Sequence, residues 1–259
     1  MRLPGREPFP RVDDHLVQPE VTRDEMIGGR RVVASPAHPP HATQHSRLDY
    51  VIQAHTAPGY IAASDLLTRH DRSSDFATDA CIYKEGIDPE TGARHLEEIA
   101  FEVVSEQNES LVTEKASRMH QRGVRRIFTV WVKGRQRVCE WSPESGSWHP
   151  LDSDASIEDP LLVAPLSASS LLDAAAADDA VAEALLAKGN PVLQAREAAI
   201  RAEASAAAIF QVLDARGIAV SPAQRQTILA CSDQERLDRW VRRAAVGSSA
   251  DDVIASTPD

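Results

Sequence analysis

The alternation of apolar and polar positions divides the chain into two parts that meet near residues 150–170. The first part alternates strand and helix patterns, and the second is rich in alanine and reads as consecutive helices. The strand patterns are GYIAAS, ATDACIY, EIAFEVVS, RRIFTVWV and RQRVCEW. EIAFEVVS is almost continuously apolar, as expected of a central strand that is covered on both faces.

Two further elements precede these strands. Gly28-Gly29 predicts a hairpin turn between VTRDEM and RRVVAS, because both glycines accept positive φ. Two consecutive prolines then predict the start of a helix over roughly 40–56. One face of this helix carries the apolar residues Leu48, Val51 and Ile52.

The later elements define the fold class. A helix over roughly 110–122, ended by Gly123, lies between two strands, and this order predicts a crossover unit within a mixed sheet. We therefore expect an α/β domain over residues 11–150, with a restriction-endonuclease-like mixed central sheet flanked by helices. An all-helical C-terminal module is expected over residues 168–256, with a small core made by Ile209, Val212, Leu213, Ile228, Leu229, Leu237 and Trp240.

Composition narrows the class of protein. With 259 residues and 42% hydrophobic residues, the chain can bury a sizeable core. It contains no run of about 18 apolar residues, so we expect no membrane span. The N-terminus lacks the apolar region of a secretory signal, and the three cysteines form no CxxC pattern. These features together favour a cytoplasmic protein in a reducing compartment.

The formal net charge of -11 is unusual for a DNA-binding protein, yet its distribution matters more than its total. Residues 1–150 hold 19 basic and 22 acidic residues, whereas residues 151–259 hold 9 and 17. The segment from Lys115 to Arg137 carries eight basic residues and no acidic one. Such a run is either a solvated face or a phosphate-binding patch, and the sequence favours neither. Its candidate contacts to a nucleic-acid backbone are Arg118, Arg122, Arg125 and Arg126.

Three carboxylates lie in or beside apolar strands. Asp79 interrupts FATDACIY, Glu102 interrupts IAFEVVS, and Glu25 lies near the end of VTRDEM, just before the hairpin turn. A carboxylate in a buried strand is costly unless it is paired or binds a metal ion. Converging carboxylates form a hard-oxygen site suited to Mg²⁺ or Mn²⁺, which can polarise a phosphodiester and lower the pKa of a bound water. A nearby lysine would stabilise charge on the attacked phosphate.

Each carboxylate also has a structural interpretation. Glu25 is more simply an exposed edge residue. Asp79 is alternatively a cap at the start of its strand. Glu102 is alternatively the solvent-facing end of a strand, although the apolar VVS that follows it disfavours this.

Four histidines gather at the first predicted helix. They have no cysteine neighbours and share no fixed i, i+4 carboxylate pattern, so a polar helix face is favoured over a zinc site. These residues are His38, His41, His45 and His55.

The order of these motifs resembles a known family. The segments DEMIGGRRVVASPAHPPH, ATDACIY, IAFEVVS and EKASRMHQRGVRRIFTVWV look like the Uma-type restriction endonuclease family of the PD-(D/E)XK nuclease superfamily. The resemblance covers residues 20–141, roughly. It implies the restriction-endonuclease-like fold, hydrolysis of DNA, and a Mg²⁺ or Mn²⁺ cofactor.

The resemblance also implies roles for individual residues. Glu25 fills the acidic position before the turn, and Asp79 matches the aspartate of the Pro-Asp motif, although Thr78 replaces the proline. Glu102 matches the acidic residue of the (D/E)XK motif, in which the usual lysine is missing. The lysine of that motif is matched instead by Lys115 on the following helix.

Two further positions complete the expected site. His41 matches a family histidine at the start of the first helix and is a candidate substrate contact. Val103, which follows Glu102, is expected to offer a main-chain carbonyl to the metal ion. Asp79 and Glu102 are its expected side-chain ligands.

The sequence therefore predicts a Mg²⁺-dependent endodeoxyribonuclease that acts on DNA. The alternative is a catalytically inactive nuclease-like binding or scaffold protein, in which the C-terminal helices serve homo-oligomerisation or docking of a partner. The helical tail is compatible with either interpretation, because it lies outside the resemblance.

Overall fold

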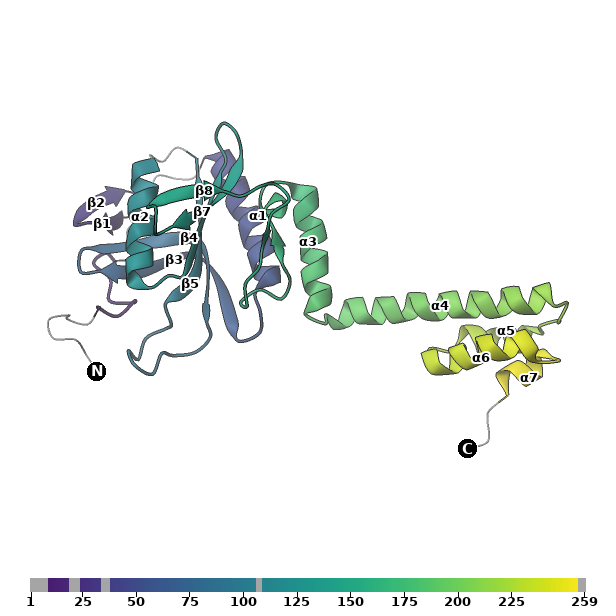
Figure 1. Ribbon diagram of the computed structural model, residues 1–259. Helices are drawn as coiled ribbons and strands as arrows, with labels where there is room; N and C mark the ends of the chain where they lie inside the picture. Colours follow the sequence, from purple (N-terminus) through teal and green to yellow (C-terminus); the bar gives the residue numbers. More distant parts are fainter. Residues whose placement is uncertain (1–8, 19–23, 34–37, 106–108, 256–259) are drawn as a thin grey trace. The chain divides into compact units, whose positions relative to one another are not determined.

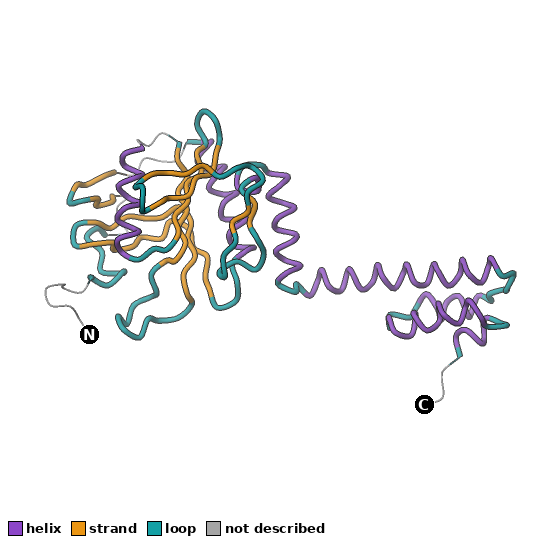
Figure 2. The backbone as a smooth tube through the Cα atoms, viewed as in Figure 1, coloured by secondary structure: helices purple, strands orange, loops and turns teal. Residues whose placement is uncertain are grey.

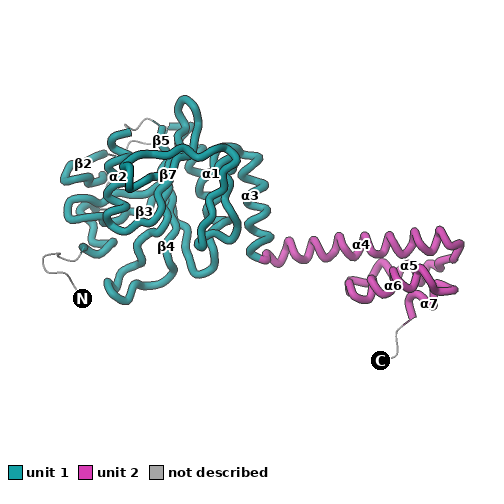
Figure 3. The backbone as a smooth tube through the Cα atoms, in the orientation of Figure 1, with its two compact units in different colours: residues 1–188 teal, residues 189–259 magenta. Residues whose placement is uncertain are grey.

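The computed structural model describes residues 9–18, 24–33, 38–105 and 109–255. The chain forms two compact units, residues 1–188 and residues 189–259 (Figure 3).

Unit 1 is built around an eight-stranded sheet with helices beside it (Figure 1). Its strands are β1 (Asp24–Ile27), β2 (Arg30–Val33), β3 (Tyr60–Asp71), β4 (Ser74–Lys84), β5 (Glu97–Val104), β6 (Arg126–Trp131), β7 (Arg137–Ser142) and β8 (Ser147–Pro150). Its helices are α1 (Pro39–His55), α2 (Glu109–Arg122) and α3 (Ala174–Ala187). Three short elements come between β8 and α3 along the chain. They are the paired strands β9 (Ser156–Ile157) and β10 (Leu166–Ser167), followed by the 3-10 helix η1 (Ser169–Leu171).

The sheet is mixed, as the sequence predicts. Its order is β2-β1-β4-β5-β6-β7-β8, and β3 pairs with β4 off this path. Figure 2 shows the strands of this unit in orange, with helices in purple beside them. Neighbouring strands are antiparallel except β5 and β6, which are parallel and joined by the crossover helix α2. The predicted fold class, a mixed central sheet flanked by helices and followed by a helical C-terminal part, is confirmed.

Strand β4 carries neighbours along both edges, and this arrangement creates the site. β3 occupies one edge over the full length of β4, so β1 and β5 share the other edge. β1 pairs with β4 only at Met26–Asp75, and the β5 ladder reaches no further than Ala80. Between these points the edge of β4 is open to side chains. There the N–H of Ala77 donates to the Glu25 carboxylate at 3.1 Å instead of to a neighbouring strand.

The helices α1 and α2 cover opposite faces of the sheet. Successive residues of a strand point to opposite faces. Phe101 of β5 accordingly packs in one buried cluster, and Ala100 packs in another. The first cluster includes Leu48, Val51 and Ile52 of α1, and the second includes Ala116 and Met119 of α2. The expectation that this strand is covered on both faces is confirmed.

Unit 2 is helical, with α4 (Pro191–Ala215), α5 (Pro222–Leu229), α6 (Gln234–Val246) and α7 (Ala250–Ile254). Its core contains Ile209, Leu213, Ile228, Leu237 and Trp240 as expected, with Val212 partly buried. The expectation for Leu229 is wrong: it ends α5 and its side chain is 58% exposed. Within the part of the chain that the structure describes, none of the helices combines the length and apolar character needed to cross a bilayer.

The compact units divide the chain at Lys188, whereas the sequence places the helical module at 168–256. The reason is that α3 packs on α1 within unit 1. The ranges 11–150 and 168–256 stay a prediction about parts that fold independently, as does homo-oligomerisation through the C-terminal helices.

His70 of β3 is a fully buried histidine beneath α2. Its ring stacks on Phe76 of β4 with the ring centroids 4.1 Å apart, and its Nε2 lies 3.8 Å from Glu97 Oε1. Burial, reinforced by repulsion from Lys115, lowers the pKa of His70 to about 3. The imidazole is therefore neutral in the folded protein at physiological pH.

We predict that His70 makes the fold sensitive to acid. Between pH 6.5 and about 3 the unfolded chain takes up a proton at His70 that the folded chain refuses, so stability falls as pH falls through this window. The contribution is at most about 1.4 kcal/mol per pH unit. Urea unfolding between pH 7 and 4.5 should show a shallower pH dependence for His70→Phe than for the wild type. Parallel profiles would contradict the prediction.

Candidate active site

Lys115 projects from the buried face of α2 toward the open edge of β4. Val112, Ala116 and Met119 are the other buried residues of this helix, and Lys115 is only 5% exposed. The ammonium Nζ lies 3.0 Å from Glu25 Oε1, 3.7 Å from Glu102 Oε2 and 3.4 Å from the Ala77 carbonyl oxygen. It also lies 5.1 Å from the centre of the Phe76 ring. The helix therefore delivers one positive charge to two carboxylates from different strands.

Glu25 fixes this charge in place. One of its oxygens, Oε1, accepts hydrogen bonds from both the Lys115 ammonium and the Ala77 main-chain N–H. Glu25 therefore occupies the gap that the divergence of β1 and β5 leaves on β4. Its position before the Gly28–Gly29 turn, where both glycines have positive φ, sets the direction of the strand that carries it.

Asp79 and Glu102 lie across from each other at the end of the β4–β5 ladder. Ala80 pairs with Phe101, so the next pair in this antiparallel register is Asp79 with Glu102. Side chains opposite each other in such a register share one face of the sheet. The ladder ends here because the Asp79 carboxylate accepts the Val103 N–H itself, at 2.6 Å.

The electrostatics of the site are governed by burial. Burial raises the pKa of Glu102 to about 8. The attraction of Lys115 lowers this pKa, whereas repulsion from the neighbouring Asp79 and Glu25 carboxylates also raises it. Burial likewise raises the pKa of Asp79. Burial opposes the charge on Lys115 as well, but Glu102, Glu25 and Asp79 outweigh it and raise the pKa of the ammonium. Lys115 therefore stays charged, while Glu102 needs a second cation to ionise fully at neutral pH.

Several oxygens at this place suit a hard divalent cation. Glu102 Oε1 is buried and has no hydrogen-bond partner among the described residues. The Val104 carbonyl accepts from Val132 of the segment after β6, so the Val103 carbonyl, one residue earlier, faces β4 and Asp79. Carboxylate and carbonyl oxygens are the ligands that Mg²⁺ and Mn²⁺ prefer. The residues thus fit such an ion, although Glu25, Asp79 and Glu102 do not form a triad with all ligand atoms within 4.8 Å.

A second group of side chains meets Asp79 from the α1 side. His41 Nε2 lies 3.8 Å and His45 Nε2 3.9 Å from Asp79 Oδ1. The sequence placed both His41 and His45 in a group of histidines and singled out His41 alone as a substrate contact, whereas Asp49 and Asp65 were not predicted. The spacing of His45 and Asp49 by four residues was the available signal, whereas Asp65 gave none because only the fold brings β3 beside α1.

The four arginines predicted to contact a nucleic-acid backbone are used within the protein. Arg118 pairs with Asp71 at 2.7 Å and with Glu114 at 2.9 Å. Arg122 donates to the Pro10 carbonyl, and Arg125 and Arg126 both pair with Asp159. Acidic residues distant in sequence therefore neutralise much of the basic run, and a role of these arginines in binding DNA stays a prediction.

Comparison with known proteins adds little to this geometry. No family model and no curated protein matches the chain. Among solved structures, a protein from Anabaena variabilis, described as a putative nuclease belonging to DUF820, is similar. The two chains share 16% sequence identity with a TM-score of 0.48, over 57% of this chain and 88% of the other. At these values the likeness carries no argument about function.

The raised pKa of Glu102 leads to a prediction about stability without metal ions. The folded pKa of about 8 exceeds the ordinary value of 4.5, so the stability contribution of Glu102 is complete below pH 4.5 and is lost as pH rises toward 8. Glu102→Gln removes this loss, and in EDTA it should melt at least as high as the wild type at pH 9. A variant that melts well below the wild type at pH 9 would show that Glu102 is stably ionised by Lys115 alone.

Proposed function

We propose that unit 1 is a metal-dependent nuclease that hydrolyses DNA phosphodiester bonds. The observation that carries the proposal is the buried Lys115 ammonium, which lies between Glu25 and Glu102, while Glu102 Oε1 has no hydrogen-bond partner in the part of the chain that the structure describes. A structural ion pair needs one carboxylate for one ammonium. Here Glu25 and Glu102 both flank a single lysine, and the charge of Asp79 also acts on it, which leaves negative charge for a divalent cation.

Asp79, Glu102 and the Val103 carbonyl would hold Mg²⁺ or Mn²⁺. When bound, such an ion lowers the pKa of a coordinated water and polarises a phosphodiester. Lys115 supplies a fixed positive charge toward the non-bridging oxygens of the phosphate, where negative charge develops. Glu25 orients the ammonium and prevents it from turning away. His41, at the entry of α1, is the proposed contact to the substrate.

The choice of DNA rests on the resemblance of residues 20–141 to the Uma-type restriction endonucleases, which we extend to this chain as part of the proposal. The acidic total of the chain does not oppose it, because most of the excess negative charge belongs to residues 151–259. A cytoplasmic location agrees with the same proposal.

A plasmid-nicking assay with the full chain tests this function. Wild-type protein with Mg²⁺ or Mn²⁺ should convert supercoiled DNA to open circles, and EDTA should abolish this. Lys115→Met and Glu102→Gln should lower the rate by at least about 100-fold, the effect of removing one preorganised charge from an active site. Circular dichroism should show that both variants are folded.

Matched controls are available on the same elements. Glu98→Gln on β5 and Lys84→Met on β4 remove a carboxylate and an ammonium away from the site, and they should keep the wild-type rate. Equal rates in all five proteins would trace the nicking to a contaminant. No nicking by the wild type, together with calorimetry that shows no Mn²⁺ binding dependent on Glu102, would favour the inactive binding protein instead. Cleavage of RNA alone would overturn the choice of substrate.

A further inference from the structure

Asp79 faces a second cluster of potential metal ligands on its other side. One ligand atom each of His45, Asp65 and Asp79 lies within 4.8 Å of the other two. His45 Nε2 is 3.7 Å from Asp65 Oδ1 and 3.9 Å from Asp79 Oδ1. The three residues come from α1, β3 and β4, so only the folded sheet brings them together.

These separations fit ligands of a shared ion better than direct hydrogen bonds. A hydrogen bond between nitrogen and oxygen is about 2.9 Å long. Two tetrahedral ligands, each about 2.1 Å from one ion, lie roughly 3.4 Å apart. His45 Nε2 is also buried without a hydrogen-bond partner among the described residues, which is costly unless a cation meets it.

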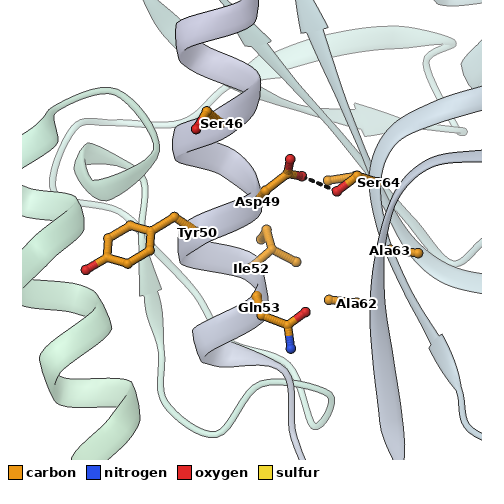
Figure 4. A pocket seen from close by; sticks show the side chains of 9 residues that line it. Ser46, Asp49, Tyr50, Ile52, Gln53, Ala62, Ala63 and Ser64 are labelled. Carbon is orange, nitrogen blue, oxygen red and sulfur yellow. Dashed lines mark hydrogen bonds between the residues drawn. The ribbon is translucent and has the colours of Figure 1, made fainter.

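The opposite nitrogen of the same imidazole is already engaged. His45 Nδ1 lies 3.3 Å from Asp49 Oδ2, and the other oxygen of Asp49 accepts the Ser64 hydroxyl at 2.5 Å. Asp49 and Ser64 line a cavity of about 410 Å³ between α1 and β3, and Figure 4 shows their hydrogen bond across it. A carboxylate at Nδ1 favours the tautomer whose proton sits on Nδ1, so Nε2 keeps its lone pair. Histidines that bind metal ions commonly have such a carboxylate behind them.

Asp65 is held in an unusual backbone conformation. It has a φ of 50°, and it is the one non-glycine residue with positive φ in the described part of the chain. Asp65 interrupts the β3–β4 ladder opposite Asp79, between the pairs Ser64–Ala80 and Leu66–Thr78. Aspartate and asparagine tolerate this conformation better than most residues.

His41 supplies a fourth candidate donor. It lies one helical turn before His45, its ring is stacked nearly parallel to that of His45, and its Nε2 is 3.8 Å from Asp79 Oδ1. Two imidazole nitrogens with two carboxylate oxygens form a donor set for a borderline transition metal such as Zn²⁺ or Co²⁺, whereas Mg²⁺ takes oxygen ligands.

We propose that His45, Asp65 and Asp79, with His41 beside them, bind a transition-metal dication. This site is separate from the oxygen-lined place at Glu102 and shares only Asp79 with it. The two oxygens of Asp79 are divided accordingly, since Oδ2 accepts the Val103 N–H and Oδ1 faces the histidines. This proposal differs from the sequence-based expectation, which favoured a polar helix face over a zinc site.

Titration of the untagged full chain with Co²⁺ tests the proposal, because bound Co²⁺ absorbs visible light according to its ligands. Wild-type protein should bind one Co²⁺ in saturable fashion, and Zn²⁺ should displace it. His45→Gln and Asp65→Asn should each weaken the affinity by at least about 10-fold, as loss of a ligand does at minimum. Asp65→Asn keeps a residue that accepts the positive φ and lies on the surface, so it tests the site without endangering the fold.

Two controls separate this proposal from the nuclease. Glu102→Gln should lower the nicking rate by at least about 100-fold and leave Co²⁺ binding unchanged. His149→Gln removes an exposed histidine of β8 and should leave Co²⁺ binding unchanged. If Co²⁺ binding depends on His45 in a protein that shows no nuclease activity, the proposed metal site is supported and only the proposed nuclease function is contradicted. Three results would overturn the proposal of this metal site. The wild type could show no saturable Co²⁺ binding, His45→Gln and Asp65→Asn could bind Co²⁺ as tightly as the wild type, or Glu102→Gln could lose Co²⁺ binding.

Discussion

The fold around the site depends on one buried ammonium. Lys115 is 5% exposed, and it is stabilised by the buried carboxylate of Glu102 and the partly buried carboxylate of Glu25. Glu25 hydrogen-bonds this ammonium directly, and removing such a partner leaves an uncompensated charge in a medium of low polarity, which costs about 3–5 kcal/mol. Each carboxylate belongs to a different strand, so the ammonium also joins β1, β5 and α2 at one point.

The open edge of β4 explains why charges gather there. In a continuous ladder the main-chain groups of Ala77 and Val103 would bond to a neighbouring strand. Here β1 and β5 separate, and the side chains of Glu25 and Asp79 accept those N–H groups instead. The backbone thereby fixes the Glu25 and Asp79 carboxylates in place, despite the repulsion between like charges at this site. The same divergence leaves Asp79 accessible from the α1 side.

Much of the fold follows from the sequence, because it depends on local signals. Periodicity and the two prolines predicted a helix over 40–56, and α1 spans Pro39–His55. The glycine pair predicted the hairpin, and the order of strand and helix patterns predicted the crossover through α2. The length of β3 was missed, since Leu67 to Asp71 continue the strand through polar residues that do not alternate regularly.

The candidate site was predicted in part. Buried acidic residues in apolar strands drew attention to Asp79 and Glu102, while Lys115 came from the family resemblance. The structure places Glu102 and Glu25 beside that lysine, and Asp79 adjoins Ala80 at the end of the ladder with β5. Asp65 and Asp159 could not be predicted, because their partners His45, Arg125 and Arg126 are brought near only by the fold. Local sequence therefore identifies a charged residue well, but it does not reveal which distant residue neutralises it.

The lysine stands on a helix, whereas both residues after Glu102 are valines that pack in the core. The part of β5 that follows Glu102 can then be apolar on both faces. The position of the Lys115 Nζ is set instead by the packing of α2 on the sheet. Displacements of about 1 Å are enough to impair catalysis. Side chains that never approach a phosphate, such as Met119 on the buried face of α2, therefore help to align the reacting groups. A change of side-chain volume at Met119 would displace α2, and with it the Lys115 ammonium.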